Sequence, residues 1–298
     1  MHGMEAQIRA AEAEAPHEVL APERQTLPLV FASPHSGSRY PQSFVAASRL
    51  DRMTLRRSED SFVDEIFHAA PKLGAPMIRA HFPRAFIDPN REPFELDPTM
   101  FEDALPAYAN TRSPRVAAGL GTIARVVANG ADIYRGKLSF GEALERIQAY
   151  YWPYHAALRE LIDETTRRFG FCVLIDCHSM PSVGGPMDRD AGAPRVDFVL
   201  GNCHGTSCAP VVTETASAAL RGLGYHVAFN APYSGGFVTR HYGRPADSVH
   251  ALQIEVNRAL YMDEGAISRS DFLPRLSRQM QGVIAALGRI DGAQLKVP

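Results

Sequence analysis

The sequence lacks the features that mark membrane and nucleic-acid-binding proteins. No apolar run approaches the roughly 18 residues that a membrane-spanning helix needs, and residues 1–25 are polar and acidic, without the apolar core of a signal peptide. The 31 Lys and Arg residues nearly balance the 33 Asp and Glu residues, and no basic block forms. We therefore expect a cytoplasmic protein whose partners are neither membranes nor nucleic acids.

The usual cysteine and serine motifs of metal binding and catalysis are also missing. The four cysteines include no CxxC pair, and three of them lie in or beside apolar segments, which is typical of buried small side chains. The Cys203/Cys208 pair flanks His204, which leaves a structural metal open. No GxSxG segment occurs, and this argues against a serine hydrolase that would use Ser179.

What remains is an ordinary globular composition. The chain has 298 residues, of which 45% are hydrophobic and 21% charged, enough for one large α/β domain. No internal repeat, low-complexity linker or break in composition divides it. We expect a flexible arm over residues 1–25 and a single domain over residues 26–298, with order beginning at Leu27.

Three apolar, strand-like segments end in polar residues. Residues 171–180 are typical of a strand buried on both faces, residues 27–33 predict a second strand, and residues 249–256 predict a last one. The polar residues in or just after these strands are His35, His178 and Glu255. An unpaired buried acid costs several kcal/mol, so we expect Glu255 to be paired, metal-bound or functional. Open α/β sheets bind ligands beyond the carboxyl ends of their strands, which predicts a common site.

The other segments divide between short strands and helices. Further strands are predicted within residues 75–82, 85–87, 197–201 and 226–230, and helices over residues 58–67, 139–170, 207–222 and 270–287. Pro153 is expected to divide or kink the long second helix. In the first helix Ser58 would be the N-cap, and Asp60 and Asp64 would share one face. Residues 118–124 match GxGxxA, but no strand precedes them, which argues against dinucleotide binding.

The polar residues at the strand ends suit one kind of chemistry. Two histidines and an acid are the ligands of a catalytic zinc with an open fourth position, and a further glutamate can take a proton from water. Arg84, Asp88, Asn90 and Arg91 gather within eight residues, and a planar guanidinium suits a carboxylate, although a surface loop with salt bridges is the alternative. The combination predicts a metal-assisted amide hydrolase.

An ordered set of motifs over roughly residues 27–290 resembles the N-formylglutamate amidohydrolase family. The motifs are Ser33-Pro-His-Ser-Gly37, Asp60-x-x-x-Asp64, Arg84-x-x-x-Asp88-x-Asn90-Arg91, Gly119-Leu-Gly121, Asp176-Cys-His-Ser179, Tyr233-Ser-Gly-Gly236 with Arg240-His-Tyr-Gly243, and Gln253-Ile-Glu-Val-Asn-Arg258. The resemblance implies a three-layer α/β/α domain with a mixed sheet, related in fold to zinc carboxypeptidases and to the aspartoacylase and succinylglutamate desuccinylase group.

The resemblance also implies an activity. It is the metal-dependent hydrolysis of the amide bond of a small anionic N-acyl amino acid, with N-formyl-L-glutamate giving formate and glutamate in histidine degradation. Two alternatives stay open: a related amidohydrolase or deacylase that acts on another short N-acyl amino acid or peptide, and a catalytically silent homologue that only binds metal or ligand.

Roles for single residues follow from the same resemblance. Zinc, or another divalent metal, would be bound by His35 and His178. Glu255 would be the general base, and Arg84 would stabilise the oxyanion. The residues expected to bind the substrate carboxylate are Asn90 and Arg91, with help from Arg240 or His241.

The acid ligand of the metal is where the chain departs from the wider group. Relatives there take a ligand from a glutamate three residues after the first histidine, and Ser38 occupies that position here. The acid must therefore come from elsewhere. Asp60 is the expected ligand, with Asp64 and Glu59 as alternatives.

Overall fold

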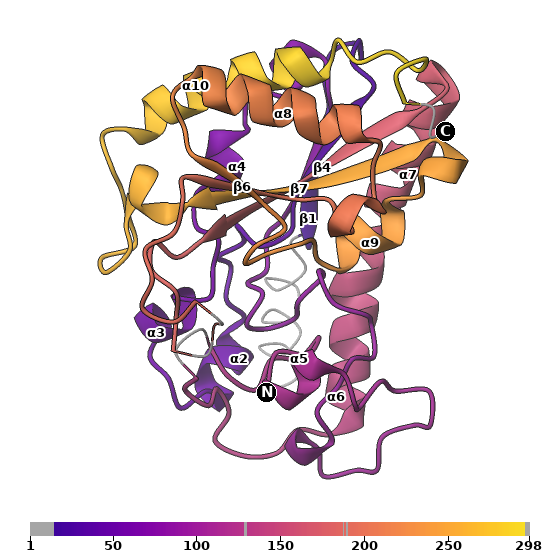
Figure 1. The fold of residues 1–298 in the computed structure, drawn as a ribbon. Coiled ribbons are helices and arrows are strands. Elements are labelled where there is room, and N and C mark those ends of the chain that lie inside the picture. The colour runs from indigo at the N-terminus through magenta and orange to yellow at the C-terminus, as the bar shows by residue number, and fades with distance from the viewer. Residues whose placement is uncertain (1–14, 128–129, 187, 189, 296–298) are drawn as a thin grey trace.

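The computed structural model describes residues 15–127, 130–186, 188 and 190–295, and within these a seven-stranded mixed sheet forms the centre of the molecule (Figure 1). The strand order is β1-β3-β2-β4-β7-β5-β6. The strands are β1 (His17–Leu20), β2 (Leu29–Ser33), β3 (Met77–Ala80), β4 (Cys172–Met180), β5 (Phe198–Gly201), β6 (Val227–Phe229) and β7 (Val249–Asn257).

Four neighbouring strands, β3, β2, β4 and β7, run parallel, so their carboxyl ends meet at one edge of the sheet. Strand β1 pairs antiparallel with β3, and β5 pairs antiparallel with β7. The two longest strands, β4 and β7, pair over nine residues that are all buried, as expected for parallel strands covered on both faces. Their register sets His178 directly beside Glu255.

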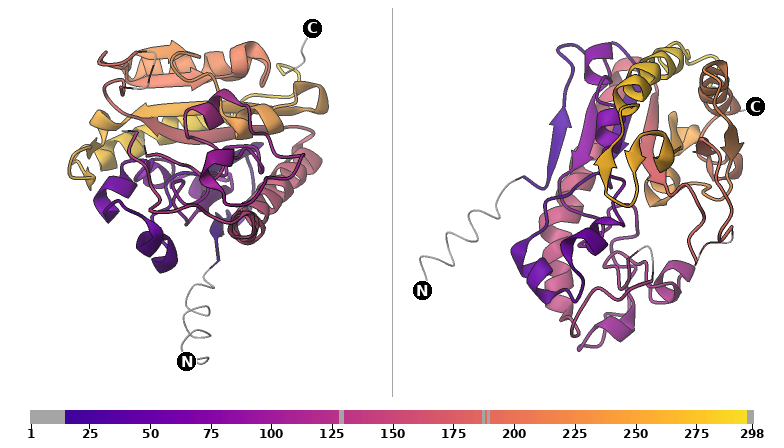
Figure 2. Two further views of the ribbon diagram at one scale, coloured as in Figure 1. Left: turned by 90° about the horizontal axis from the view of Figure 1, so that it is seen from below. Right: turned by 90° about the vertical axis from the view of Figure 1, so that its left-hand side faces the viewer.

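Helices cover both faces of the sheet. One face carries α4 (Val63–Ile66), α8 (Pro210–Gly222) and α10 (Leu273–Leu287), and the other carries α7 (Trp152–Phe169) (Figures 1 and 2). Side chains alternate along β2, so that Leu29 and Phe31 join the first core and Val30 and Ala32 the second. The predicted three-layer α/β/α architecture with a mixed sheet is confirmed.

The remaining elements are short and lie mostly in the connections. They are α2 (Gln42–Ala47), α3 (Arg52–Arg56), α5 (Pro114–Ala117), α6 (Phe140–Arg146), α9 (Phe237–Tyr242), and the hairpin of β8 (Met262–Asp263) and β9 (Ser268–Arg269). Among the helices of the described ranges, none combines the length and the apolar character that crossing a bilayer requires.

Order begins before Leu27, which corrects the expected extent of the N-terminal arm. Strand β1 lies at the edge of the sheet, and its Glu18 accepts a hydrogen bond from Arg79 Nη2 of β3 at 2.7 Å. A four-residue edge strand with polar residues carries little periodicity, so the pattern did not indicate it. Residues 1–14 of the expected arm lie outside the described residues.

The helix expected from Ser58 is also corrected. Residues 58–62 form turns, and α4 begins only at Val63, after Phe62 in a left-handed conformation with φ of 67°. Asp60 therefore lies in a turn, while Asp64 lies in α4 and pairs with Arg79 Nη1 at 2.6 Å. The two acids do not share a helix face. Residues 85–87, expected as a strand, are part of a turn as well.

The long helical segment is divided as predicted. Helix α6 starts with a capping box between Ser139 and Glu142, and a π-helical turn over Ile147–Tyr151 separates it from α7. Pro153 occupies the first turn of α7, where its missing N–H costs nothing. In α7, Tyr154 is fully buried and belongs to the second core.

His155 of α7 fastens the segment that follows Asp88. Its Nε2–H donates to the Pro89 carbonyl at 2.8 Å, and its Nδ1 accepts from the Tyr242 hydroxyl of α9 at 2.9 Å. Burial, with a contribution from His241 and Arg159, lowers the pKa of His155 to about 4, although the hydrogen bond to the Pro89 carbonyl acts in the opposite direction. The folded protein therefore keeps this imidazole neutral.

We expect this imidazole to make the protein less stable at acidic pH. Between pH 6.5, the ordinary pKa, and about pH 4 the unfolded chain binds a proton that the folded chain excludes, so stability falls as pH falls. His155→Gln removes this titration. The loss of unfolding free energy from about pH 7.5 to about pH 5 should shrink by on the order of 2 kcal/mol. Urea unfolding at several pH values measures it, and equal pH slopes in both proteins would contradict it.

Candidate metal centre

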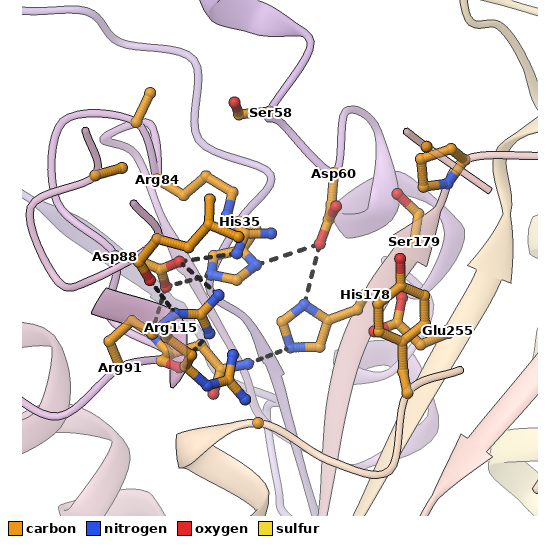
Figure 3. A pocket seen from close by; sticks show the side chains of 18 of the residues that line it. His35, Ser58, Asp60, Arg84, Asp88, Arg91, Arg115, His178, Ser179 and Glu255 are labelled. Atoms are coloured by element: carbon orange, nitrogen blue, oxygen red, sulfur yellow. Dashed lines mark hydrogen bonds and ion pairs between the residues drawn. The ribbon is translucent and has the colours of Figure 1, made fainter. Parts of the chain in front are cut away.

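His35, Asp60 and His178 converge at the carboxyl edge of the parallel strands. One candidate ligand atom from each lies within 4.8 Å of the other two, and all three residues are buried (Figure 3). Asp60 Oδ2 is 3.3 Å from His35 Nδ1 and 3.0 Å from His178 Nδ1. The structure thus brings together the two predicted histidines and the preferred acid from three separate segments.

The two alternative acids lie elsewhere. Asp64 pairs with Arg79, as described above. Glu59 is the neighbour of Asp60 in sequence, but its carboxylate accepts hydrogen bonds from Arg56, Ser61 and the Tyr40 hydroxyl. Both acids are therefore engaged away from the histidine pair.

Each imidazole is oriented by a second carboxylate. His35 Nε2 lies 2.7 Å from Asp88 Oδ1, and His178 Nε2 lies 2.8 Å from Asp176 Oδ1. Metal-binding histidines commonly donate their other ring N–H to a carboxylate, which directs the remaining nitrogen at the metal. Both Nδ1 atoms face Asp60 Oδ2, and His35 Nδ1 is buried without a hydrogen-bond partner among the described residues. Two imidazole nitrogens and one carboxylate oxygen are a donor set that fits zinc or a similar divalent cation.

The charges around these atoms favour a cation. Burial by itself raises the pKa of Asp60, but the contacts with His178 and His35 bring it well below its usual range. Burial lowers the pKa of His178, but Asp176 and Asp60 outweigh burial and raise it well above its ordinary value. The carboxylates of Asp60 and Asp176 therefore stabilise positive charge beside the two imidazoles. A bound divalent cation would supply such a charge.

Arg258 positions Asp60 from the opposite side. Its Nη2 donates to Asp60 Oδ1 at 3.0 Å and to the Glu59 carbonyl at 2.7 Å, and its Nε donates to Ser179 Oγ at 3.1 Å. Oδ1 of Asp60 is thereby engaged, and Oδ2 is left to the histidines. Arg258, Asp88 and Asp176 were not predicted as supporting residues. For Asp176, its place two residues before His178 on one face of a strand was a usable signal.

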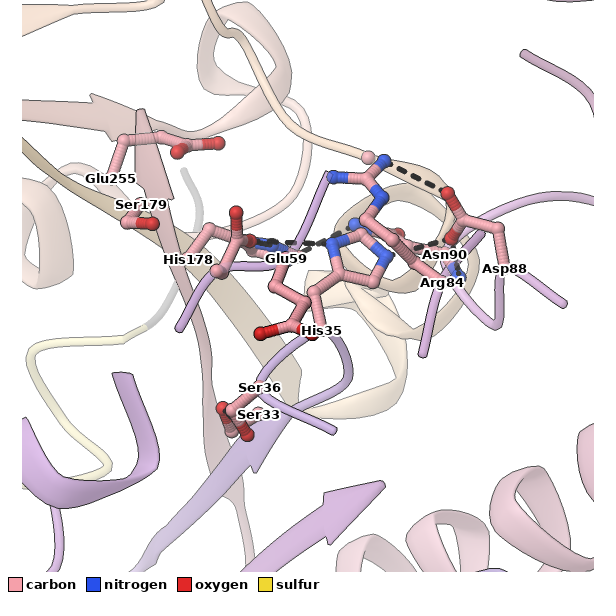
Figure 4. A network of polar contacts seen from close by, with 12 residues as sticks. Ser33, His35, Ser36, Glu59, Arg84, Asp88, Asn90, His178, Ser179 and Glu255 are labelled. Atoms are coloured by element: carbon pink, nitrogen blue, oxygen red, sulfur yellow. Dashed lines mark hydrogen bonds and ion pairs between the residues drawn. The ribbon is translucent and has the colours of Figure 1, made fainter. Parts of the chain in front are cut away.

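Glu255 lies on the other side of the histidine pair from Arg84 and Asp88 (Figure 4). It belongs to β7, is buried, and its Oε1 accepts from Gln253 Nε2 at 2.6 Å. Burial raises the pKa of Glu255 to about 7, while His178 acts in the opposite direction. A carboxyl group with a pKa near neutrality suits proton transfer.

The predicted arginines line the same pocket. Arg84 Nη2 donates to Asp88 Oδ2 at 2.8 Å. Arg91 donates from Nε to the Leu120 carbonyl at 2.8 Å and from Nη1 to the Asn90 carbonyl at 2.9 Å, and burial lowers its pKa to about 9. Asp88 therefore contacts both an arginine and a histidine of the site.

Asn90 connects this loop to α9. Its Oδ1 accepts from Val238 N at 2.7 Å, and its Nδ2 lies 3.1 Å from His178 Nε2. Gly236 permits the approach, because a Cβ there would lie 2.2 Å from Asn90 Nδ2. The Gly236 N–H donates to Gln253 Oε1 at 2.7 Å, which orients the amide that contacts Glu255.

Two of the predicted substrate-binding residues do not line the pocket. Arg240 is exposed on α9, and His241 stacks on Phe237 with ring centroids 4.8 Å apart. The pocket has a volume of about 340 Å³, within the range of small-molecule sites. Its polar lining includes His35, Asp60, Arg84, Asp88, Asn90, Arg91, Arg115, His178, Gln253, Glu255 and Arg258. Arg115 was not singled out from the sequence.

Fold and site together define a three-layer α/β/α protein with a candidate His–Asp–His metal centre beside several arginines. A sequence profile of the N-formylglutamate amidohydrolase family matches residues 27–262. The chain belongs to the N-formylglutamate amidohydrolase family.

Individual relatives agree with this. The N-formylglutamate deformylase of Pseudomonas putida is 31% identical over 250 residues, covering 83% of this chain and 86% of the relative. That of Pseudomonas aeruginosa is 32% identical over 252 residues, covering 84% and 87%. The crystal structure of N-formylglutamate amidohydrolase from Ralstonia eutropha is 37% identical, covers 93% of this chain and 97% of its own, and superposes with a TM-score of 0.83.

Proposed function

We propose that the protein hydrolyses the amide bond of N-formyl-L-glutamate to formate and L-glutamate, with a divalent metal ion bound by His35, Asp60 and His178. The observation that carries the proposal is the convergence of these three buried side chains next to Glu255 and the arginines. The family, whose relatives are named N-formylglutamate deformylase, supports the choice of substrate.

When bound, zinc or a similar cation supplies Lewis-acid activation of a water molecule and of the scissile carbonyl. The protein contributes the remaining groups. Glu255, oriented by Gln253, accepts the proton of the attacking water and returns it to the leaving amine. Arg84, on the opposite side of the histidines, donates to the carbonyl oxygen as negative charge develops on it.

The same pocket provides for the substrate's α-carboxylate. Arg91 uses Nε and Nη1 for backbone carbonyls, but its Nη2 is 3.7 Å from Asp88 Oδ2 and can donate to a ligand. Asn90 also lines the pocket, and its Oδ1 accepts a hydrogen bond from Val238 N of α9. These contacts select an anionic N-acyl amino acid. The cytoplasmic location and a role in histidine degradation stay predictions.

A comparison of substrates tests the proposed activity. The purified protein with zinc should release formate from N-formyl-L-glutamate faster than it hydrolyses the acetyl or succinyl derivatives of glutamate and aspartate, and a chelator should stop the reaction. A preference for acetyl or succinyl would favour the related deacylase. Zinc binding without turnover on any compound of the panel would favour the silent homologue.

Replacing His178 tests the metal centre. His178→Ala removes one of three ligands, so we expect metal affinity to fall at least about 100-fold and formate release to be lost. Metal titration and the release assay measure the two effects, with circular dichroism to check folding and His178→Gln as a second variant. His226→Ala is the control, because the His226 side chain is 86% exposed and lies outside the His35–Asp60–His178 group. Full metal content and rate in the variants would overturn the assignment.

Replacing Glu255 separates proton transfer from metal binding. Glu255→Gln keeps the size and the contact with Gln253 but cannot accept the proton, so kcat should fall about 10²–10⁴-fold while metal is retained. Glu214→Gln on the exposed face of α8 is the matched control. An undiminished kcat would remove Glu255 from the role of base.

A further inference from the structure

We propose that Arg115 binds the side-chain carboxylate of the substrate and so determines the preference for an acidic N-acyl amino acid. The proposal deepens the function proposed above and rests on it for the reaction. The carboxylate-binding part can be tested by itself.

Arg115 lies in the pocket on the side of Arg84 and Arg91. In Figure 3 it lies with Arg91 and Asp88, across the histidine pair from Glu255. It belongs to α5, where Ser113 Oγ caps the helix by accepting from Val116 N at 3.0 Å and also bonds to the buried Glu95. This places a short helix with one cationic side chain at the wall of the cavity.

The backbone around Arg115 is hydrogen-bonded to the segment 88–91, which contains Asp88 and Arg91. The Arg115 carbonyl accepts from Leu120 N at 2.8 Å, and the Leu120 carbonyl accepts from Arg91 Nε at 2.8 Å. Thr122 N donates to the Glu95 carbonyl, and Asp88 N donates to the Thr122 carbonyl, each at 2.8 Å. These hydrogen bonds fix the backbone of Arg115 relative to that of Arg91. A site that binds two anionic groups requires such a fixed spacing between its two cations.

Arg115 differs from Arg84, Arg91 and Arg258, the other pocket arginines that are not exposed, in having no partner in the described part of the chain. Arg84 pairs with Asp88, Arg258 pairs with Asp60, and Arg91 donates to two backbone carbonyls. The Arg115 guanidinium forms no hydrogen bond or ion pair with any described residue. It is nevertheless partly buried, and an unpaired charge in such a place is unfavourable.

The charges around Arg115 make its unpaired positive charge still less favourable. Burial and the neighbouring Arg240 lower the pKa of Arg115, and Glu95 and Asp88 offset this only in part. An arginine stays protonated in a protein, so the positive potential remains and attracts an anion. A carboxylate on Arg115 would neutralise it and could accept two parallel N–H bonds.

The shape of the substrate explains why two cationic positions are needed. N-formylglutamate carries one carboxylate next to the reacting amide and a second at the end of a side chain of two methylene groups. With the amide between Glu255 and Arg84, Arg91 takes the near carboxylate and Arg115 takes the far one. A substrate with a neutral side chain leaves the Arg115 guanidinium unpaired and is disfavoured.

The test compares two substrates of the same size and different charge. In Arg115→Gln, kcat/KM for N-formyl-L-glutamate should fall on the order of 100-fold, while kcat/KM for N-formyl-L-glutamine changes less than about threefold. Arg115→Lys keeps the charge without the planar fork and should retain part of the preference. Arg112→Gln is the control, because Arg112 lies three positions earlier, is exposed and is absent from the pocket lining.

A binding measurement is independent of turnover. Calorimetry with glutarate should give a Kd about 100-fold weaker for Arg115→Gln than for the wild type and the control. An unchanged glutamate-to-glutamine ratio together with unchanged glutarate binding would overturn the role of Arg115, even if the wild type releases formate. A wild type that binds glutarate through Arg115 but does not hydrolyse N-formylglutamate would instead overturn the proposed function.

Discussion

The carboxylate of Asp60 is buried between two imidazoles and a guanidinium, and the geometry of the centre depends on it. Oδ2 faces His35 and His178, and Oδ1 accepts from Arg258. A buried carboxylate needs such partners because its desolvation is costly. Asp60 lies in a turn between α3 and α4. Its carboxylate contacts residues from three other places: His35 after β2, His178 in β4 and Arg258 after β7.

Asp88 is a second carboxylate that connects several groups of the pocket: it contacts His35 on one side and the arginines Arg84 and Arg91 on the other. One oxygen contacts His35, and the other accepts from Arg84 and lies near Arg91. The same carboxylate thus orients a candidate metal ligand and two groups assigned to the substrate. Because buried charges interact strongly, a change at either end alters the electrostatic environment of the other. On the proposed roles, metal affinity and substrate affinity should therefore be coupled through Asp88.

Much of the candidate centre could be predicted because three of its residues lie in or just after apolar strands. The segments 27–33, 171–180 and 249–256 correspond to β2, β4 and β7, and parallel order brings His35, His178 and Glu255 to one edge.

Other parts depend on contacts that a local pattern does not encode. Asp60 was expected on a helix, but its turn is fixed by Arg258, which lies 198 residues away. Arg115 lies in an irregular region with only short helices, where hydrophobic periodicity is too weak to place a side chain.

The nine-residue pairing of β4 and β7 has a consequence for how the site responds to heat. Both strands are buried on both faces and belong to the part of a domain that opens only with global unfolding, whereas α5 is a single turn in an irregular segment. On the proposed roles, the metal ligand His178 and the base Glu255 lie on these two strands, whereas Arg115, which selects the acidic side chain of the substrate, lies on backbone that opens more easily. Mild warming should therefore weaken the preference for acidic over neutral N-acyl amino acids before hydrolysis itself is lost.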